Sequence, residues 1–235
     1  MNGSTGEEKK FDYILKLIND IISDKLDLEE DEKEYSSNNN LDLINACKHG
    51  DKKKVEQLIK DGADVNMKNE YGDAPLTVLC ENLNSESLEL IKLLVKNGAK
   101  ITVNNSTGSS ILNILCKQNN KYSLSIIDYL IKKGADINYR DENGITPLLT
   151  ACYFNNVITL SHLIEQKKAD INVNNNYNDS PLMVSVYFNN IKNIQYFINK
   201  NADIYTTNKN EDTFQSIFKN LKYKKKILKK SKYGN

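Results

Sequence analysis

The strongest constraint on this chain is a short segment that recurs five times at nearly constant spacing. The segment is "DGADVN" at 61–66 and "NGAKIT" at 97–102, and it returns as "KGADIN", "KKADIN" and "KNADIY". Its second position advances by 36, 36, 34 and 33 residues, counted over Gly62, Gly98, Gly134, Lys168 and Asn201. A period of about 20 to 50 residues indicates a repeat array, in which each unit buries its apolar face only against its neighbours.

Each unit is predicted to contain two short helices. An amphipathic segment such as "VEQLIK" precedes each recurring segment, and a turn rich in Asn, Asp and Gly follows the first four. The turns lead into "YGDAPL" (71–76), "TGSSIL" (107–112), "NGITPL" (143–148) and "YNDSPL" (177–182). The only three prolines, Pro75, Pro147 and Pro181, fall where a helix would begin, and a missing N–H is tolerated there. The pattern predicts helix-turn-helix units with β-turn connections.

These landmarks resemble the ankyrin repeat, whose pattern joins a glycine turn, Thr-Pro-Leu-His, two helices and Gly-Ala-Asp-Val-Asn. The resemblance covers roughly 41–205 in five repeats and implies an all-α solenoid that binds proteins without catalysis. The histidine of the family pattern is absent, which predicts a weaker hydrogen bond between neighbouring turns; its place is taken by Thr77, Asn113, Leu149 and Met183. Repeats four and five also lack the loop-closing glycine.

The flanking segments are predicted to be caps and a tail. Residues 1–28 form an expected amphipathic capping helix, which also aligns as a degenerate repeat, with apolar Phe11, Ile14, Leu15, Ile18, Ile21, Ile22 and Leu26. An acidic linker (29–40) precedes the repeats. A truncated capping repeat (206–221) and a lysine-rich tail (222–235) follow them.

Composition excludes several classes of function. The formal net charge is +1 and Arg140 is the only arginine, which argues against nucleic-acid binding over the whole surface. No apolar run reaches the roughly 18 residues of a membrane-spanning helix, and no secretory signal is expected. We therefore expect a cytoplasmic protein, with a secreted effector or a nuclear protein left open. The asparagine runs at 38–40 and 174–176 are interpreted as the effect of an AT-rich coding genome.

The residues that could carry chemistry do not form a recognisable constellation. The four cysteines occupy one repeat position, spaced by 33, 36 and 36 residues, and are expected to be core packing: Cys47, Cys80, Cys116 and Cys152. Repeats about 10 Å apart are too distant for a disulfide or a shared zinc ion. His49 is expected to be solvated and His162 partly packed. We therefore expect no enzyme, no metal, no cofactor and no small-molecule substrate.

Aromatic residues gather at variable positions of the later repeats. The resemblance implies that the two residues after the small pair of the first helix face a concave groove, and only repeats four and five make them aromatic. The predicted partner-binding residues, mainly in repeats three to five, are Tyr139, Arg140, Glu142, Ile145, Tyr153, Phe154, Asn176, Tyr177, Tyr187 and Phe188. The competing interpretation is packing, with the tyrosines facing outward and the phenylalanines inward.

Two other functions remain open on the sequence. The N-terminal amphipathic helix, rather than the groove, could recruit the partner. The lysine-rich tail could contact nucleic acid or an anionic membrane. In the main interpretation the protein is a monomeric interaction module for a protein partner.

Overall fold

The structure is a computed structural model, and it describes residues 39–219. The predicted capping segment 1–28, most of the predicted linker 29–40 and the predicted tail 222–235 lie outside the described residues. The first described helix begins at Asn39, two residues before the predicted start of repeat one.

Eleven short helices lie in the described residues, and the only strand pairing there consists of two isolated bridges. The helices are α2 (Asn39–His49), α3 (Lys52–Lys60), α4 (Pro75–Glu81), α5 (Ser87–Lys96), α6 (Ile111–Lys117), α7 (Ser123–Lys132), α8 (Pro147–Tyr153), α9 (Val157–Glu165), α10 (Pro181–Tyr187), α11 (Ile191–Asn199) and α12 (Phe214–Lys219).

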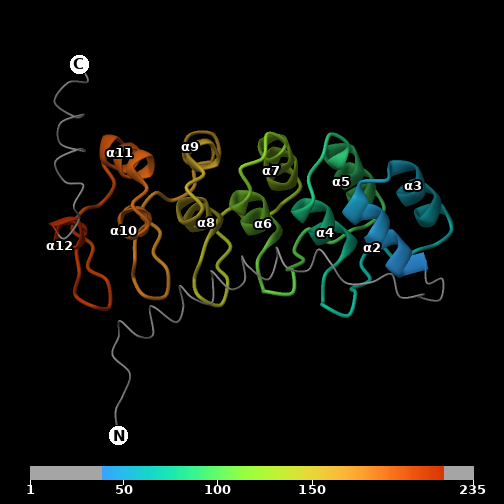
Figure 1. Ribbon diagram of the computed structural model, residues 1–235, viewed down its shortest axis with the longest axis horizontal. Helices are drawn as coiled ribbons and strands as arrows, with labels where there is room; N and C mark the ends of the chain where they lie inside the picture. Colours follow the sequence, from blue (N-terminus) through green and yellow to red (C-terminus); the bar gives the residue numbers. More distant parts are fainter. Residues whose placement is uncertain (1–38, 220–235) are drawn as a thin grey trace, which may run out of the picture. The chain divides into compact units, whose positions relative to one another are not determined.

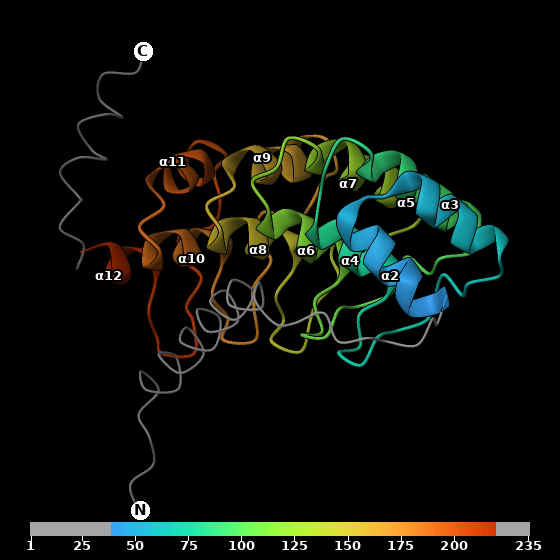
Figure 2. The same ribbon diagram turned by 45° about the vertical axis from the view of Figure 1, so that its right-hand side comes forward.

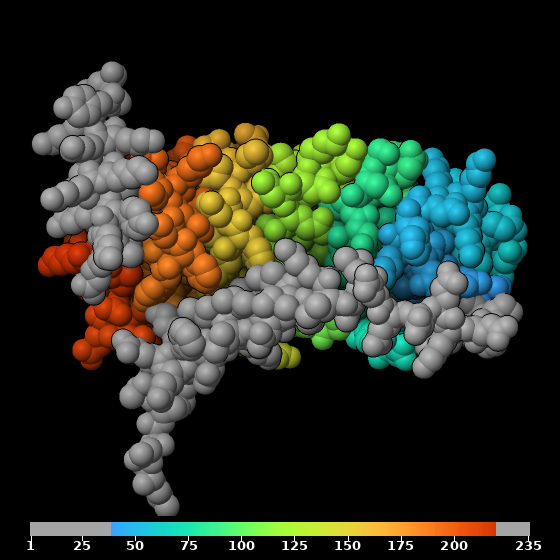
Figure 3. All heavy atoms as spheres, viewed as in Figure 1, coloured from blue at the N-terminus to red at the C-terminus, as the bar shows by residue number. Residues whose placement is uncertain are grey.

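The helices form two layers, which Figures 1 and 2 show from two directions. The even-numbered helices form an inner layer, in which each helix from α2 to α12 packs on the next. The odd-numbered helices form an outer layer, with contacts that run from α3 through α5 and α7 to α9. In the space-filling view the repeats appear as adjoining bands of colour (Figure 3). This is the expected all-α solenoid of helix-turn-helix units.

Helix starts follow the predicted chemistry. Pro147 is the first residue of α8, and the side chain of Thr146 accepts a hydrogen bond from the backbone N–H of Leu149. Ser180 and Pro181 begin α10 in the same way. An oxygen at the cap satisfies an N–H that has no partner inside the helix, and proline supplies no N–H that would need one. The prediction that prolines open these helices is confirmed, because Pro75 also begins α4.

In the inner helix of each of the five repeats, one position holds a small and fully buried residue. It is 0% exposed in all five repeats, at Cys47, Cys80, Cys116, Cys152 and Val186. The expectation that the cysteines are core packing is therefore confirmed. Burial disfavours the thiolate, so it raises the pKa of each thiol, that of Cys47 to about 12.

The loops between repeats share one Asn or Asp residue, and we call these five residues the Asx ladder: Asn69, Asn105, Asp141, Asn175 and Asn208. In each loop the backbone N–H of the ladder residue donates to the carbonyl four residues ahead, at 2.9 to 3.2 Å. The side-chain oxygen of the same residue accepts from the N–H groups two and four residues ahead. One side chain thus closes each loop, as in an Asx turn.

Two of the five recurring segments, at 167–172 and 200–205, reach the left-handed conformation at their second position without glycine. Lys168 has φ 58° and Asn201 has φ 55°, at positions where Gly62, Gly98 and Gly134 also have positive φ. Asparagine tolerates this region, whereas a lysine there is strained by about 1 to 2 kcal/mol because its Cβ crowds the backbone. The array therefore retains its loop geometry at Lys168 at a cost in stability.

We predict that Lys168→Gly stabilises the protein by about 0.5 to 1 kcal/mol. Glycine relieves the backbone strain of the folded state, but it also loses more conformational entropy on folding than lysine does. The expected gain in stability is the difference between these two free energies. Urea unfolding followed by circular dichroism measures it. The matched control is Lys133→Gly, because Lys133 follows α7 with φ −87°. A gain of equal size in the control would contradict the explanation by backbone strain.

Candidate functional site

The candidate site begins at the carboxyl ends of α8 and α10. Tyr153 and Tyr187 are the last residues of these helices, and Phe154 and Phe188 are the residues that follow. All four side chains are half-buried. The equivalent positions of the first three repeats hold Lys48-His49, Glu81-Asn82 and Lys117-Gln118. We call the four aromatic residues the aromatic platform.

The rings of the platform contact one another across the two repeats. The centroids of the Tyr153 and Phe188 rings lie 5.2 Å apart with an interplanar angle of 86°, an edge-to-face pair. This is a favourable arrangement for aromatic quadrupoles. On the other side, the Lys117 ammonium lies 5.8 Å from the centroid of the Phe154 ring. The contacts of the platform therefore extend from Lys117 of repeat three to Phe188 of repeat five.

The tyrosine hydroxyls turn toward the loops of the following repeats. The Tyr153 hydroxyl accepts a hydrogen bond from Nδ2 of Asn175 at 3.3 Å, and the Tyr187 hydroxyl accepts one from Nδ2 of Asn208 at 2.9 Å. Burial, followed by the nearby carboxylates of Asp179 and Asp212, raises the pKa of Tyr187. Both hydroxyls thus have partners inside the protein, which leaves the carbon part of each ring for surface contact.

Three of the predicted loop residues bond to one another or to the next loop. The Arg140 guanidinium donates to the carbonyl of Asn174 at 2.6 Å and to Oδ1 of Asn176 at 3.3 Å. Nδ2 of Asn176 donates to the carbonyl of Glu142 at 2.8 Å. Gly144 permits this approach, because a Cβ there would lie 2.8 Å from the backbone nitrogen of Asn176. Arg140, Glu142 and Asn176 are all exposed.

The remaining predicted residues differ in exposure. The half-buried Tyr139 accepts a hydrogen bond from Nδ2 of Asn104 at 2.7 Å, and Tyr177 is also half-buried. Ile145 differs from the expectation, because its side chain is 5% exposed. It precedes Thr146, the residue that caps α8, and it packs into the core, so it offers no contact surface.

The residue that replaces the family histidine in repeat three restores a bond between turns. Nδ2 of Asn113 donates to the carbonyl of Ile145 at 3.2 Å, and the two residues belong to neighbouring repeats. The predicted weakening therefore does not apply at this junction. Sequence reasoning missed this bond, because asparagine is not part of the family pattern there.

Sequence reasoning also missed the Asx ladder and with it the residues that hold the tyrosine hydroxyls. Asn175 lies inside the run 174–176 that was attributed to composition. A signal was present in the chain, because the ladder positions advance by 36, 36, 34 and 33 residues, the same intervals as the recurring segment. An Asn or Asp that recurs in register indicates a loop function, whereas an isolated asparagine run does not.

The two histidines lie as expected and do not join the site. His49 is exposed, and its Nδ1 lies 2.8 Å from the carbonyl of Asn45. The His162 side chain is 17% exposed and contacts Asp128 of the neighbouring outer helix at 2.7 Å. Lys167 reaches the same Asp128 oxygen at 2.9 Å. We interpret this cluster as a link between α7 and α9.

The described residues thus form a helical repeat scaffold whose candidate site is a surface platform. The family model of ankyrin repeats matches the chain in three copies, at residues 20–105, 43–141 and 112–208. Because these matches span more than half of the chain, the protein belongs to the ankyrin repeat family. Members of this family are generally protein–protein interaction modules and are typically not enzymes.

A comparison of the sequence with curated proteins finds no match. Among the helices within residues 39–219, each is too short or too polar to span a bilayer.

We predict that Asp128→Asn destabilises the protein by about 0.5 kcal/mol at pH 7, a small effect because the Asp128 side chain is 44% exposed. Partial burial alone would raise the pKa of Asp128, but hydrogen bonds from Lys167 and His162 lower it overall. A carboxyl with a lowered pKa stabilises the fold above its unfolded value of about 3.9. This contribution is lost as the pH falls through the folded pKa.

Urea unfolding of both proteins at pH 7 and again near pH 3 measures the difference. The control is Glu70→Gln, which neutralises an exposed loop acid. The Asp128 difference should disappear at the lower pH, and a difference that persists there would contradict the electrostatic explanation.

Proposed function

We propose that this protein binds a protein partner through the groove face of its later repeats, mainly repeats three to five. The aromatic platform supplies the anchor, and the exposed loop residues Arg140, Glu142 and Asn176 form its rim. Tyr139 and Tyr177 add half-buried aromatic surface beside them. The proposal extends the general role of the family to one surface of this chain.

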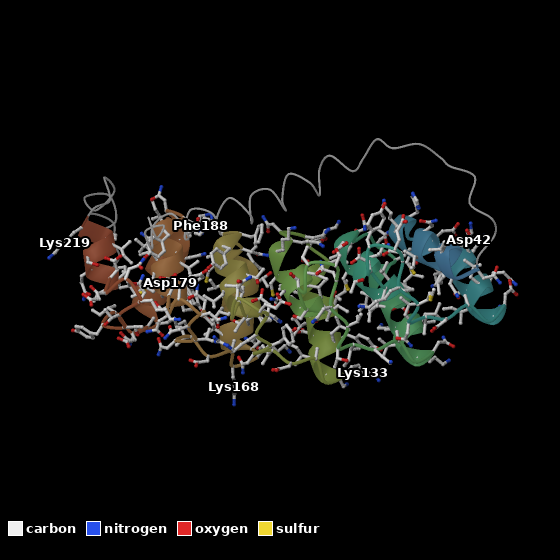
Figure 4. The ribbon with its side chains drawn as sticks, turned by 90° about the horizontal axis from the view of Figure 1, so that it is seen from below. Asp42, Lys133, Lys168, Asp179, Phe188 and Lys219 are labelled. Carbon is white, nitrogen blue, oxygen red and sulfur yellow. The ribbon has the colours of Figure 1, made fainter. Side chains whose placement is uncertain are left out.

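The observation that carries the proposal is the placement of the four aromatics. They occupy positions that are charged or polar in the first three repeats, and they lie together in the two repeats that touch through α8 and α10. Figure 4 shows Phe188 toward one long edge of the molecule, opposite Lys133 and Lys168 at the ends of α7 and α9. Phe154 and Phe188 lie at the ends of the inner helices, beside the short turns that lead into α9 and α11.

The geometry favours binding for two physical reasons. Tyrosine and phenylalanine bury large areas while few torsions are restricted, so clustered aromatics dominate the energy of many interfaces. The rings are also already ordered, through the edge-to-face pair and the two hydroxyl hydrogen bonds. A partner that contacts an ordered ring loses less conformational entropy than one that must immobilise it.

We predict that replacing Tyr153 and Tyr187 together by alanine weakens binding of the partner by about tenfold or more. Truncation of a central aromatic anchor costs about 2 kcal/mol or more, whereas rim residues cost little. The native protein captures its partner in an affinity pull-down, mass spectrometry identifies it, and calorimetry then measures the dissociation constant of each variant.

The matched control replaces Tyr129 and Tyr196 by alanine. Both are half-buried tyrosines, but they belong to the outer helices α7 and α11. Circular dichroism should show that both double variants stay folded. Equal binding by the native protein and the Tyr153/Tyr187 variant, or equal weakening in the control, would refute the proposed surface.

A further inference from the structure

A buried chain of polar side chains joins the two tyrosines of the aromatic platform. It contains Asn175, Asp179 and Asn208, which are 4%, 3% and 6% exposed. Nδ2 of Asn208 donates both to Oδ1 of Asp179 at 2.8 Å and to the Tyr187 hydroxyl at 2.9 Å. Nδ2 of Asn175 lies 3.5 Å from Oδ2 of Asp179 and 3.3 Å from the Tyr153 hydroxyl. The chain thus joins both platform tyrosines through one carboxylate.

The loops determine the orientation of both amides. The Oδ1 atoms of Asn175 and Asn208 each accept two backbone N–H groups of their own loops. Each side chain therefore turns its NH₂ group toward Asp179 and toward a tyrosine hydroxyl. An NH₂ group can only donate hydrogen bonds. Asp179 also interacts with the Tyr187 hydroxyl as an acceptor. The two carboxyl oxygens of Asp179 accept from both amides, whereas an asparagine at this position would turn an NH₂ group toward another donor.

Only this junction has such a chain among the described loops. The positions equivalent to Asp179 hold Asp73, Ser109, Ile145 and Asp212. The carboxylate of Asp73 accepts from the backbone N–H of Ser106 instead, and the Asp212 carboxylate accepts from the Ser216 hydroxyl. Figure 4 labels Asp179 and Phe188, which lie at opposite ends of α10. The chain therefore lies in the loops before α10 and α12, and it reaches the platform only through the two tyrosine hydroxyls.

We propose that Asn175, Asp179 and Asn208 are positioning residues that hold the rings of Tyr153 and Tyr187 in the shape a partner meets. Asn208 lies in the loop between α11 and α12. The arrangement of the platform rings therefore depends on the folding of this loop. The inference rests on the proposed function for its consequence in binding, but its structural content can be measured without a partner.

The test is Asn208→Asp. Asp141 shows that an aspartate makes the same two loop bonds through Oδ1, at 2.9 and 2.7 Å, so the loop should still close. The substitution replaces the donor NH₂ by an oxygen, so two carboxylates face each other at positions 179 and 208, and their repulsion is expected to open the chain around the Tyr187 hydroxyl. Exchange is measured by NMR in protein with ¹³C-labelled tyrosine. The deuterium isotope shift of the Cζ signal reports how fast the Tyr187 hydroxyl proton exchanges with solvent, and the Tyr187→Phe variant identifies which signal belongs to Tyr187. We expect exchange about tenfold faster or more in Asn208→Asp.

A second variant separates the polar chain from a general loss of stability. Adding Asp179→Asn to Asn208→Asp exchanges donor and acceptor between the two positions. The amide introduced at position 179 can then donate to the carboxylate introduced at position 208, while its oxygen still accepts from Asn175, so slow exchange should return. Asn69→Asp is the control, because Asn69 closes the first loop far along the array, and it should leave the Tyr187 hydroxyl unchanged.

The outcomes are distinct. Unchanged hydroxyl exchange in Asn208→Asp, or fast exchange that the double variant does not reverse, would overturn the inference. Equal acceleration in Asn69→Asp would overturn it too, because the effect would then be one of global stability. A partner that binds the Tyr153/Tyr187 alanine variant normally would refute the proposed function without altering the exchange measurement.

Discussion

The architecture depends on one hydrogen-bonding device, the side-chain oxygen of each Asx ladder residue. A loop between two repeats must reverse the chain while its backbone N–H groups remain satisfied. One Asn or Asp oxygen accepts two of these groups in every loop, from Asn69 to Asn208. The inner helices begin a few residues later, so this closure determines where each helix starts. The constant loop is what lets helices of different sequence stack in register.

Asparagine performs a second function between the two helices of a repeat. Nδ2 of Asn190 donates to the carbonyl of Cys152 at 2.7 Å, and Nδ2 of Asn156 donates to the carbonyl of Gln118 at 2.7 Å. Each bond satisfies a carbonyl at the end of the preceding inner helix, where no partner exists inside the helix. Asn156 also accepts from the N–H of Thr159 and so caps α9. Buried amides thus connect neighbouring repeats at the carboxyl ends of the inner helices.

The sequence predicted the features that depend on local chemistry. Prolines located the starts of three inner helices, and the cysteine position was recognised as core because small residues recur in register. The tyrosine hydroxyl bonds could not be predicted, because Tyr187 and Asn208 are 21 residues apart and meet only after two repeats stack. Asn175 was discounted for a related reason: composition describes how often a residue occurs, whereas its function depends on its place in the loop. Ile145 was misplaced because a loop position was assumed to be a surface position.

The ladder also explains why the platform is compatible with a stable array. The amide of a ladder residue meets the last residue of the preceding inner helix: Asn105 donates to Glu81 at 3.0 Å, as Asn175 and Asn208 donate to the tyrosines. In repeat three that helix ends in Lys117, and the next ladder residue is Asp141, an acceptor. At Asn105, Asn175 and Asn208 the amide of the ladder residue thus requires an acceptor on that helix. Tyrosine satisfies this requirement through its hydroxyl while its ring remains at the surface, which glutamate or lysine cannot do. A binding surface can therefore be built at this position without an unpaired amide beneath it.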